Sequence, residues 1–179
     1  KKTYFCYMKK YMLLLAAFAA LVLTPSCQKG VVDPAKEPKP DPEPKEETVD
    51  APEGFTGFQY GEWTYMLRTV VLEKSGAKNA VKLLKENLDE IDGLLPEKAL
   101  TVMHKHPIWL EEHLTDGAAW YHQSKEWLAS QGYMTEKWHC VKLCNYVHYV
   151  SWTKQNQPYM VLHELCHLYH DQALSGGFD

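Results

Sequence analysis

The spacing of apolar residues along the chain alternates between the period of a helix and the short runs typical of strands. From Val81 to Leu95, apolar side chains recur at steps of three and four residues, and Pro96 follows. This period places them on one face, so we expect an amphipathic helix that ends at Pro96. Short runs rich in aromatic and β-branched residues predict strands. We place these strands at residues 63–73, 99–104, 108–110 and 141–144.

Three further helices are predicted from residues that begin or end them. Ser124 and Asn145 are of the types that cap helices, and Gly132 can end the first of these helices. Pro158 fits the first turn of the last helix. Strands that alternate with helices favour a layered fold of both elements, and we assign the α+β class. The expected helices cover residues 124–130, 145–154 and 158–174.

The N-terminal part has the components of an export signal. Residues 8–26 start at Met8 with a basic segment, continue with an apolar run over 12–23 and end in small residues before Cys27. This order is typical of a secretory signal, and its end resembles a bacterial lipobox. We therefore expect a lipid on Cys27 and an extracytoplasmic protein anchored to a bacterial membrane, at the outer membrane or cell surface. A plain signal peptide or a buried helix is the alternative, and residues 1–7 are expected to be upstream readthrough.

A proline-rich segment follows the signal. Six of the ten prolines lie between residues 31 and 53, among many Asp, Glu and Lys and few apolar residues. Such a composition cannot bury enough apolar surface to offset chain entropy, and its prolines favour an extended backbone. We expect residues 27–53 to tether a folded catalytic domain at residues 54–179. A disordered tail without that task is the alternative.

Composition narrows the classes of function. The formal net charge is −4 and the sequence pI is about 6.1. The aromatic residues do not interleave with Lys and Arg, so we expect no nucleic-acid partner. No apolar run reaches the roughly 18 residues of a membrane-spanning helix, which argues against a multi-pass membrane protein. All nine histidines follow residue 100, so we expect the chemistry in the second half of the chain.

Two histidines and a glutamate in the last expected helix form the zinc-binding pattern H-E-x-x-H. They are His163, Glu164 and His167. Residues four apart differ by about 40° around a helix and by one turn along it, so both imidazoles can reach one metal ion. Glu164 then lies beside the metal's open position, where a carboxylate can act as a general base toward water. The alternative is a pair of core histidines with a surface glutamate.

The chain around this pattern resembles a known group of zinc enzymes. Residues 157–172, QPYMVLHELCHLYHDQ, are similar to the active-site helix of zincin metallopeptidases, in the branch of the gluzincins and of anthrax lethal factor. GAAWYH at 117–122, EWL at 126–128 and GY at 132–133 resemble the same group, so the likeness covers most of residues 60–179. The resemblance implies a zincin-like fold with a small mixed sheet, packed helices and a buried active-site helix.

The resemblance also implies a site. His163 and His167 would bind Zn²⁺, and Glu164 would be the general base of a metallopeptidase with a peptide or protein substrate. Gluzincins take a third zinc ligand from a Glu on a later helix, yet no Glu follows Glu164, and we expect the sequence to be truncated before it. His170 is the local alternative, although three stacked side chains on one straight helix span about 10 Å. Asp171 could accept the free N–H of His167.

The other histidines and the cysteines leave several readings open. His122 could line the cleft or be a satisfied structural histidine. Cys140, Cys144 and His148 recur at four-residue steps, a spacing that fits packed positions more often than a second metal site. A disulfide between Cys140 and Cys144 is an option in an oxidising compartment.

Two functions are therefore consistent with the sequence. The first is a lipid-anchored zinc metallopeptidase that hydrolyses peptide bonds with a metal-activated water and Glu164 as the base. The second is a non-catalytic surface lipoprotein that keeps the zincin fold and binds a partner or a glycan. The two differ at two points, because the enzyme needs a third zinc ligand and the carboxylate of Glu164, whereas the binding protein needs neither.

Overall fold

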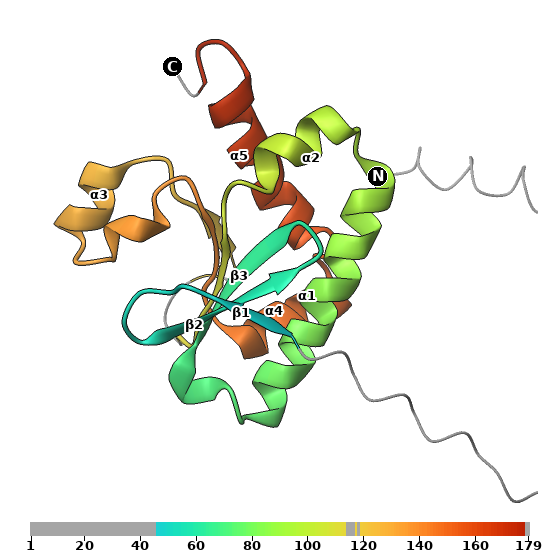
Figure 1. Ribbon diagram of the computed structural model, residues 1–179, viewed down its shortest axis with the longest axis vertical. Coiled ribbons are helices and arrows are strands. Elements are labelled where there is room, and N and C mark those ends of the chain that lie inside the picture. The colour runs from blue at the N-terminus through green and yellow to red at the C-terminus, as the bar shows by residue number, and fades with distance from the viewer. Residues whose placement is uncertain (1–45, 114–116, 118, 178–179) are drawn as a thin grey trace, which may run out of the picture. The chain divides into compact units, whose positions relative to one another are not determined.

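The centre of the fold is one mixed sheet. We analysed a computed structural model that describes residues 46–113, 117 and 119–177. Within these residues the sheet has six strands, β1 Glu47–Val49, β2 Phe55–Tyr60, β3 Trp63–Arg68, β4 Ile108–Leu110, β5 Ala119–Tyr121 and β6 Val141–Leu143. Their order is β1-β2-β3-β4-β6-β5 (Figure 1). The first three pair antiparallel, β3, β4 and β6 pair parallel, and β5 is antiparallel to β6 at the edge of the sheet.

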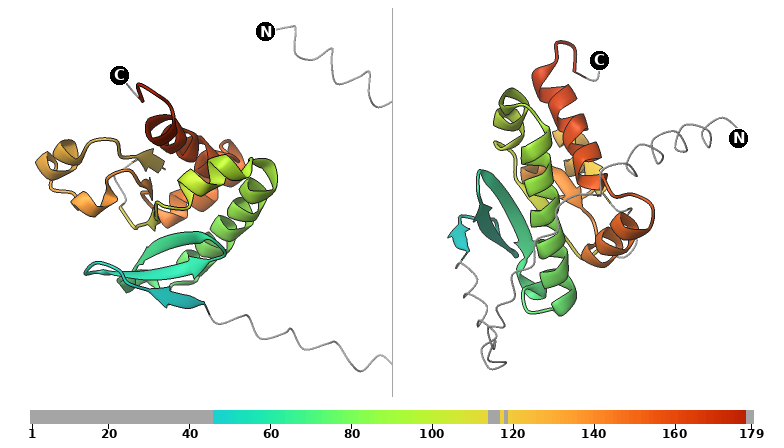
Figure 2. Two further views of the ribbon diagram at one scale, coloured as in Figure 1. Left: turned by 45° about the horizontal axis from the view of Figure 1, so that its top comes forward. Right: turned by 90° about the vertical axis from the view of Figure 1, so that its right-hand side faces the viewer.

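All of the described α-helices except α3 cover one face of this sheet (Figure 1). The helices are α1 Ser75–Leu94, α2 Glu97–Met103, α3 Lys125–Ser130, α4 Tyr146–Gln155 and α5 Met160–Ala173, with 3₁₀ turns η1 Thr69–Val71 and η2 Thr135–Lys137. Helix α1 packs beside α4 and α5, and α2 packs against α5 (Figure 2). Their apolar sides form the main core with the inward side chains of β3, β4 and β6. Strands and helices share one core, which confirms the α+β class.

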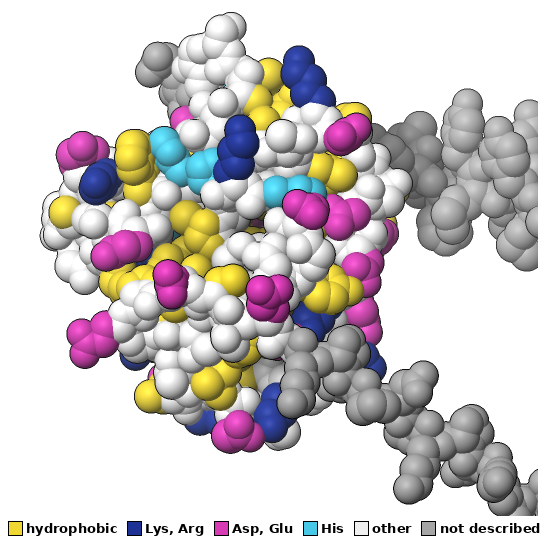
Figure 3. Space-filling model, in the orientation of Figure 1, with side chains coloured by type: hydrophobic (Ala, Val, Ile, Leu, Met, Phe, Trp, Pro, Cys, Tyr) yellow, Lys and Arg dark blue, Asp and Glu magenta, His cyan; other side chains and the backbone are white. Residues whose placement is uncertain are grey.

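The opposite face of the sheet carries a smaller apolar cluster. Phe55, Met66, Trp109 and Cys140 are buried there, and Met134 packs against them. The rings of Phe55 and Trp109 meet edge to face, with centroids 4.8 Å apart. In Figure 3, hydrophobic side chains gather between α3 and the loop that joins β1 to β2 (compare Figure 1). This cluster supports the segment that leads from β5 through α3 to β6.

Several of the expected local signals are confirmed. The Ser124 hydroxyl accepts the backbone N–H of Trp127 at 3.1 Å and begins α3. The Asn145 side-chain oxygen accepts the N–H groups of Val147 and His148 at 2.8 and 3.1 Å and begins α4. These bonds satisfy N–H groups that the first turn of a helix leaves without partners. Helix α1 ends at Leu94, close to the Pro96 stop.

Two strand predictions need correction. Residues 99–104 lie mostly in a helix, α2, in which Ala99 and Met103 are buried one turn apart. Thr101 donates its hydroxyl to the Glu97 carbonyl, four residues earlier, at 2.9 Å, a bond typical of a helical turn. An apolar run this short fits both periods, and packing against α5 selects the helix. The strand expected at 63–73 ends at Arg68 and continues as η1.

The sheet also begins earlier than the expected domain boundary at residue 54. Strand β1 lies within the segment 27–53 assigned to the tether, and it pairs with β2. Glu46, next to β1, accepts the Tyr65 hydroxyl at 2.8 Å and pairs with Lys85. A Cβ at Gly57 would lie 2.9 Å from Val49, so a glycine is needed where β1 meets β2.

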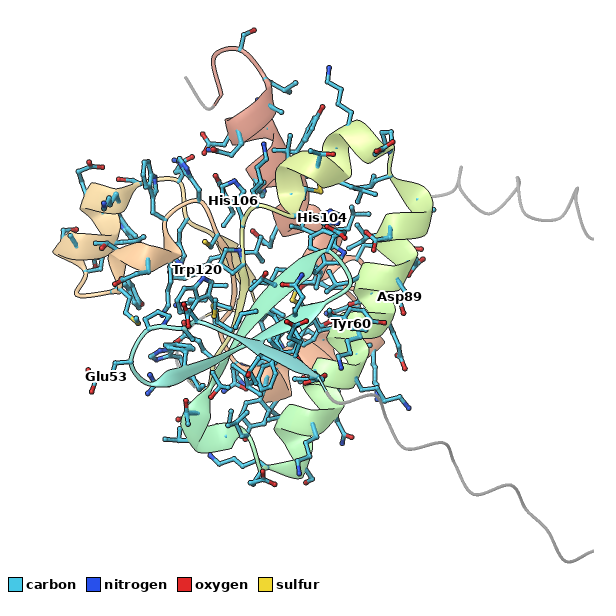
Figure 4. The ribbon with its side chains drawn as sticks, in the orientation of Figure 1. Glu53, Tyr60, Asp89, His104, His106 and Trp120 are labelled. Carbon is cyan, nitrogen blue, oxygen red and sulfur yellow. The ribbon has the colours of Figure 1, made fainter. Side chains whose placement is uncertain are left out.

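The long helix α1 is joined to the β2–β3 hairpin by hydrogen bonds. Tyr60 donates its hydroxyl to Asp89, 2.9 Å from each carboxylate oxygen, and the two side chains meet in Figure 4. Trp63 donates its indole N–H to Asp92 at 3.0 Å. These bonds hold the antiparallel part of the sheet against α1.

The expected signal peptide, Cys27 and most of the tether lie outside the described residues. Among the residues that the structure does describe, no helix combines the length and apolar character needed to cross a membrane. Cys140, Cys144 and Cys166 are free thiols, so the optional Cys140–Cys144 disulfide is not formed.

Candidate metal centre

Helix α5 turns one side to the core and the other to an open cleft. Its buried side chains are Met160, Val161, Leu165 and Leu168. His163 is exposed, and Glu164 and His167 are partly exposed. The expectation of a buried active-site helix is therefore correct for one side only. The histidine side lies along β5, which is the edge strand of the sheet formed by the described residues.

The two histidines of the motif point at a common position. Their Nε2 atoms are 3.1 Å apart, and their rings lie nearly perpendicular, at 84°. Two nitrogens bound tetrahedrally to one zinc ion at 2.0–2.1 Å would lie about 3.3–3.4 Å apart. The pair therefore fits two of the ligands of one zinc ion with little movement. Without metal, the same distance suits a hydrogen bond between one protonated and one unprotonated nitrogen.

Glu164 lies beside this pair and is held by the sheet. Burial raises the pKa of its carboxyl, while the neighbouring His163 and His167 and a hydrogen bond from the Tyr121 backbone N–H act in the opposite direction. A general base is most effective when its pKa lies near the working pH, and a raised pKa brings that of a carboxyl group closer to neutral pH. The Tyr121 N–H fixes the position of the carboxylate relative to β5.

Tyr121 also joins β5 to the end of α5. Its hydroxyl donates to the Asp171 carboxylate at 2.5 Å. Burial, followed by this bond and the carboxylate charge, raises the pKa of the Tyr121 hydroxyl. Asp171 also lies 3.4 Å from His139 and accepts the Gln172 side chain at 2.8 Å. The proposed bond from His167 to Asp171 stays a prediction.

Two hollows flank Glu164 and share Ala119 of β5. The hollow on the His163 side has a volume of about 430 Å³ and includes Trp152 and Tyr159. The hollow on the His167 side has a volume of about 690 Å³. It is lined by Ala119, Trp120, Tyr121, His122, Gln123, Ser124, Trp127, Glu164 and His167. The two hollows and Glu164 together form an open cleft along β5.

A third metal ligand is not present among residues 46–113, 117 and 119–177, because no group of three His, Cys, Asp or Glu side chains there could hold a metal ion. His170 is exposed on α5 and does not complete the pair. Helix geometry gives the reason, since His163 and His170 are separated by about 10 Å along the axis. His122 is buried and lines the larger hollow, as one reading of the sequence expected.

The sequence did not reveal the role of β5. Tyr121 and Trp127 lie in the segments 117–122 and 126–128 that resemble the zincin group, but we predicted no strand there and assigned neither residue a role in the site. Trp152, which lines the hollow on the His163 side, carries no motif of its own. The aromatic run at residues 120–122 is the signal that could have indicated a strand at the cleft.

We compared the chain with protein-family models, with curated proteins and with solved structures, and none of them matches it.

Proposed function

We propose that this protein is a zinc-dependent metallopeptidase with a zincin-like fold. One observation carries the proposal: the His163 and His167 Nε2 atoms approach to 3.1 Å, with the Glu164 carboxylate held beside them at the edge of a sheet. Both histidines and Glu164 border the open cleft, which favours a metal site over a pair of core histidines with a surface glutamate.

The residues of the site divide the work. His163 and His167 would hold the zinc ion, which when bound supplies a Lewis acid for the scissile carbonyl and lowers the pKa of water. Glu164 accepts a proton from the attacking water and passes it to the leaving amine. The Tyr121 N–H keeps the Glu164 carboxylate aimed into the cleft, so the base needs little reorganisation.

The edge strand suits a peptide substrate. The Tyr121 N–H points to Glu164 rather than to β6, so the outer edge of β5 faces the metal helix. Because the Tyr121 N–H is engaged with Glu164, an extended peptide would add to this edge through other main-chain groups of β5, and its side chains would occupy the spaces on either side. The two hollows beside Glu164 supply those spaces.

A second candidate function rests on a specific observation. The described residues bring only two of the usual three zinc ligands together. A non-catalytic surface lipoprotein that binds a partner or a glycan needs no third ligand. Lipidation at Cys27 and an extracytoplasmic location belong to both proposals.

Glu164→Gln separates the two candidates. In the enzyme, this variant binds as much zinc as the wild type by elemental analysis and loses hydrolysis of an unfolded protein substrate by at least about 100-fold, the lower range for a general base. His163→Ala should lose both zinc and hydrolysis, and His148→Ala on α4 serves as the control that changes neither. Equal hydrolysis by wild type and Glu164→Gln would exclude the proposed mechanism, and zinc-bound wild type without any hydrolysis would favour the binding protein.

A further inference from the structure

We infer that the hollow on the His167 side is a subsite for an aromatic side chain of the substrate, next to the bond that is cleaved. The inference rests on the proposed function and adds a substrate class to it. Four rings from three segments, which we call the aromatic wall, pack together beside this hollow; three of them line it, and Tyr133 packs against two of these three. The four are Trp120, His122, Trp127 and Tyr133.

The rings of the aromatic wall pack against one another around Trp127. Its indole lies nearly parallel to the His122 and Tyr133 rings, with centroids 5.9 and 5.7 Å away and 25° between each pair of planes. The Trp120 ring lies 6.0 Å from Trp127 at 60°. Trp127 itself is 41% exposed and lines the hollow. A large exposed indole that other rings hold in place offers a surface for a further ring.

The backbone fixes the position of the wall before any substrate binds. Ser124 caps α3 by accepting the backbone N–H of Trp127, and this bond fixes the backbone position from which the indole projects. Leu128 of α3 is fully buried, and its carbonyl accepts the Tyr133 backbone N–H at 2.9 Å. A preorganised wall loses little entropy when a ligand binds, so ring contacts convert efficiently into affinity.

The charges around the hollow favour an uncharged side chain. Lys142 is fully buried, with its ammonium 4.4 Å from the Tyr133 centroid and 5.2 Å from the Trp120 centroid. A cation already placed against these rings makes a second cation in the hollow less favourable. Glu164, at the other end of the hollow, disfavours a second carboxylate.

An aromatic ring fits better than a sugar. Sugar recognition by a tryptophan needs polar groups around the ring edge. Glu164 and His167 in the lining belong to the proposed metal site, and the Tyr121 hydroxyl donates to Asp171, which leaves Gln123 and Ser124 beside the aromatic wall. The Ser124 hydroxyl is already engaged with the Trp127 N–H and with Glu126. Glu164 and His167 also line the hollow, so the side chain bound there would come from a substrate residue next to the scissile carbonyl.

The test measures binding, so it does not depend on turnover. The full chain carrying Glu164→Gln and loaded with zinc is titrated by calorimetry with peptides acetyl-Gly-Gly-X-Gly-Gly-amide, where X is Phe, Leu, Lys or Asp. Burial and stacking of a ring predict about ten-fold tighter binding for Phe than for Lys. The same ring contacts should favour Phe over Asp, although Glu164→Gln removes the charge that disfavours Asp in the wild type. Adding Trp127→Ala should reduce this preference to less than about three-fold, since most of the exposed ring surface is then gone.

Matched variants locate the subsite. Trp127→Phe should keep the preference for Phe, because it keeps a ring. Trp152→Ala, which removes an indole of similar exposure (38%) from the other hollow, should keep it too. Circular dichroism and zinc content show whether each variant is folded. If Trp127→Ala does not fold, the inference is tested by whether Trp127→Phe and Trp152→Ala keep the preference for Phe.

Several results would overturn the subsite. Equal affinity for all four peptides would exclude it, and loss of the preference in Trp152→Ala but not in Trp127→Ala would place it in the other hollow. Tighter binding of an N-acetylglucosamine oligomer, lost in Trp127→Ala, would replace the aromatic peptide with a glycan. Phe-selective binding without hydrolysis by the wild type would keep the subsite and reject the peptidase.

Discussion

Replacing Tyr121 by Phe removes one hydrogen bond between the edge strand and the metal helix. The Tyr121 hydroxyl donates to Asp171 at 2.5 Å, and the Asp171 side chain is 17% exposed. A hydrogen bond to a charged group contributes about 1.5–3 kcal/mol to stability. Asp171 keeps its contacts with Gln172 at 2.8 Å and with His139 at 3.4 Å, which offset part of the loss. We therefore expect Tyr121→Phe to lower the free energy of unfolding by about 1–2 kcal/mol.

Urea unfolding followed by tryptophan fluorescence measures this loss. The slope of the unfolding free energy against urea concentration should be the same in the variant and the wild type. The matched control is Tyr159→Phe, because Tyr159 is 58% exposed and a hydroxyl at the surface should matter by less than about 0.5 kcal/mol. Tyr121→Phe keeps the backbone N–H that holds Glu164, so zinc binding should be retained. Equal stability of Tyr121→Phe and the wild type would refute the argument that this bond joins β5 to α5.

Three further predictions follow from the burial of single side chains. Leu165 is fully buried in the core, so Leu165→Ala should cost about 2–5 kcal/mol in chemical denaturation. Glu111→Gln should lower the free energy of unfolding by about 3–5 kcal/mol, because the Glu111 carboxylate and the Lys137 ammonium form a buried ion pair with an Oε1–Nζ distance of 2.5 Å. Adding Lys137→Met should recover part of this loss in a double-mutant cycle. Burial raises the folded-state pKa of Glu164 above its ordinary value of 4.5, so the folded state holds the proton more tightly than the unfolded state does. Metal-free wild type should therefore lose stability relative to Glu164→Gln as the pH rises from about 4.5 through the higher folded-state pKa of Glu164. Parallel curves of unfolding free energy against pH for the two proteins would contradict the raised pKa.

Features that depend on neighbouring residues could be predicted from the sequence. Ser124 and Asn145 were identified as caps because a capping oxygen acts on N–H groups only two or three residues away. The approach of His163 and His167 is equally local, since a four-residue step on one helix brings their nitrogens to the same place.

Features that depend on pairing across the chain were decided by the tertiary structure. Residues 99–104 fit a strand or a helix until packing against α5 buried Ala99 and Met103 on one helical side. Strand β1 emerged from a segment whose composition alone favours an extended tether, because β2 supplies its hydrogen-bond partners.

The candidate site combines both kinds of information. The H-E-x-x-H spacing provides the metal-binding pair, and this could be seen in the sequence. The placement of the Tyr121 N–H against Glu164, and of Trp127 beside the cleft, requires β5 to lie at the edge of the sheet next to α5. A four-residue spacing is set by the geometry of a single helix, whereas the neighbour of a strand edge is set by the packing of every strand and helix in the domain.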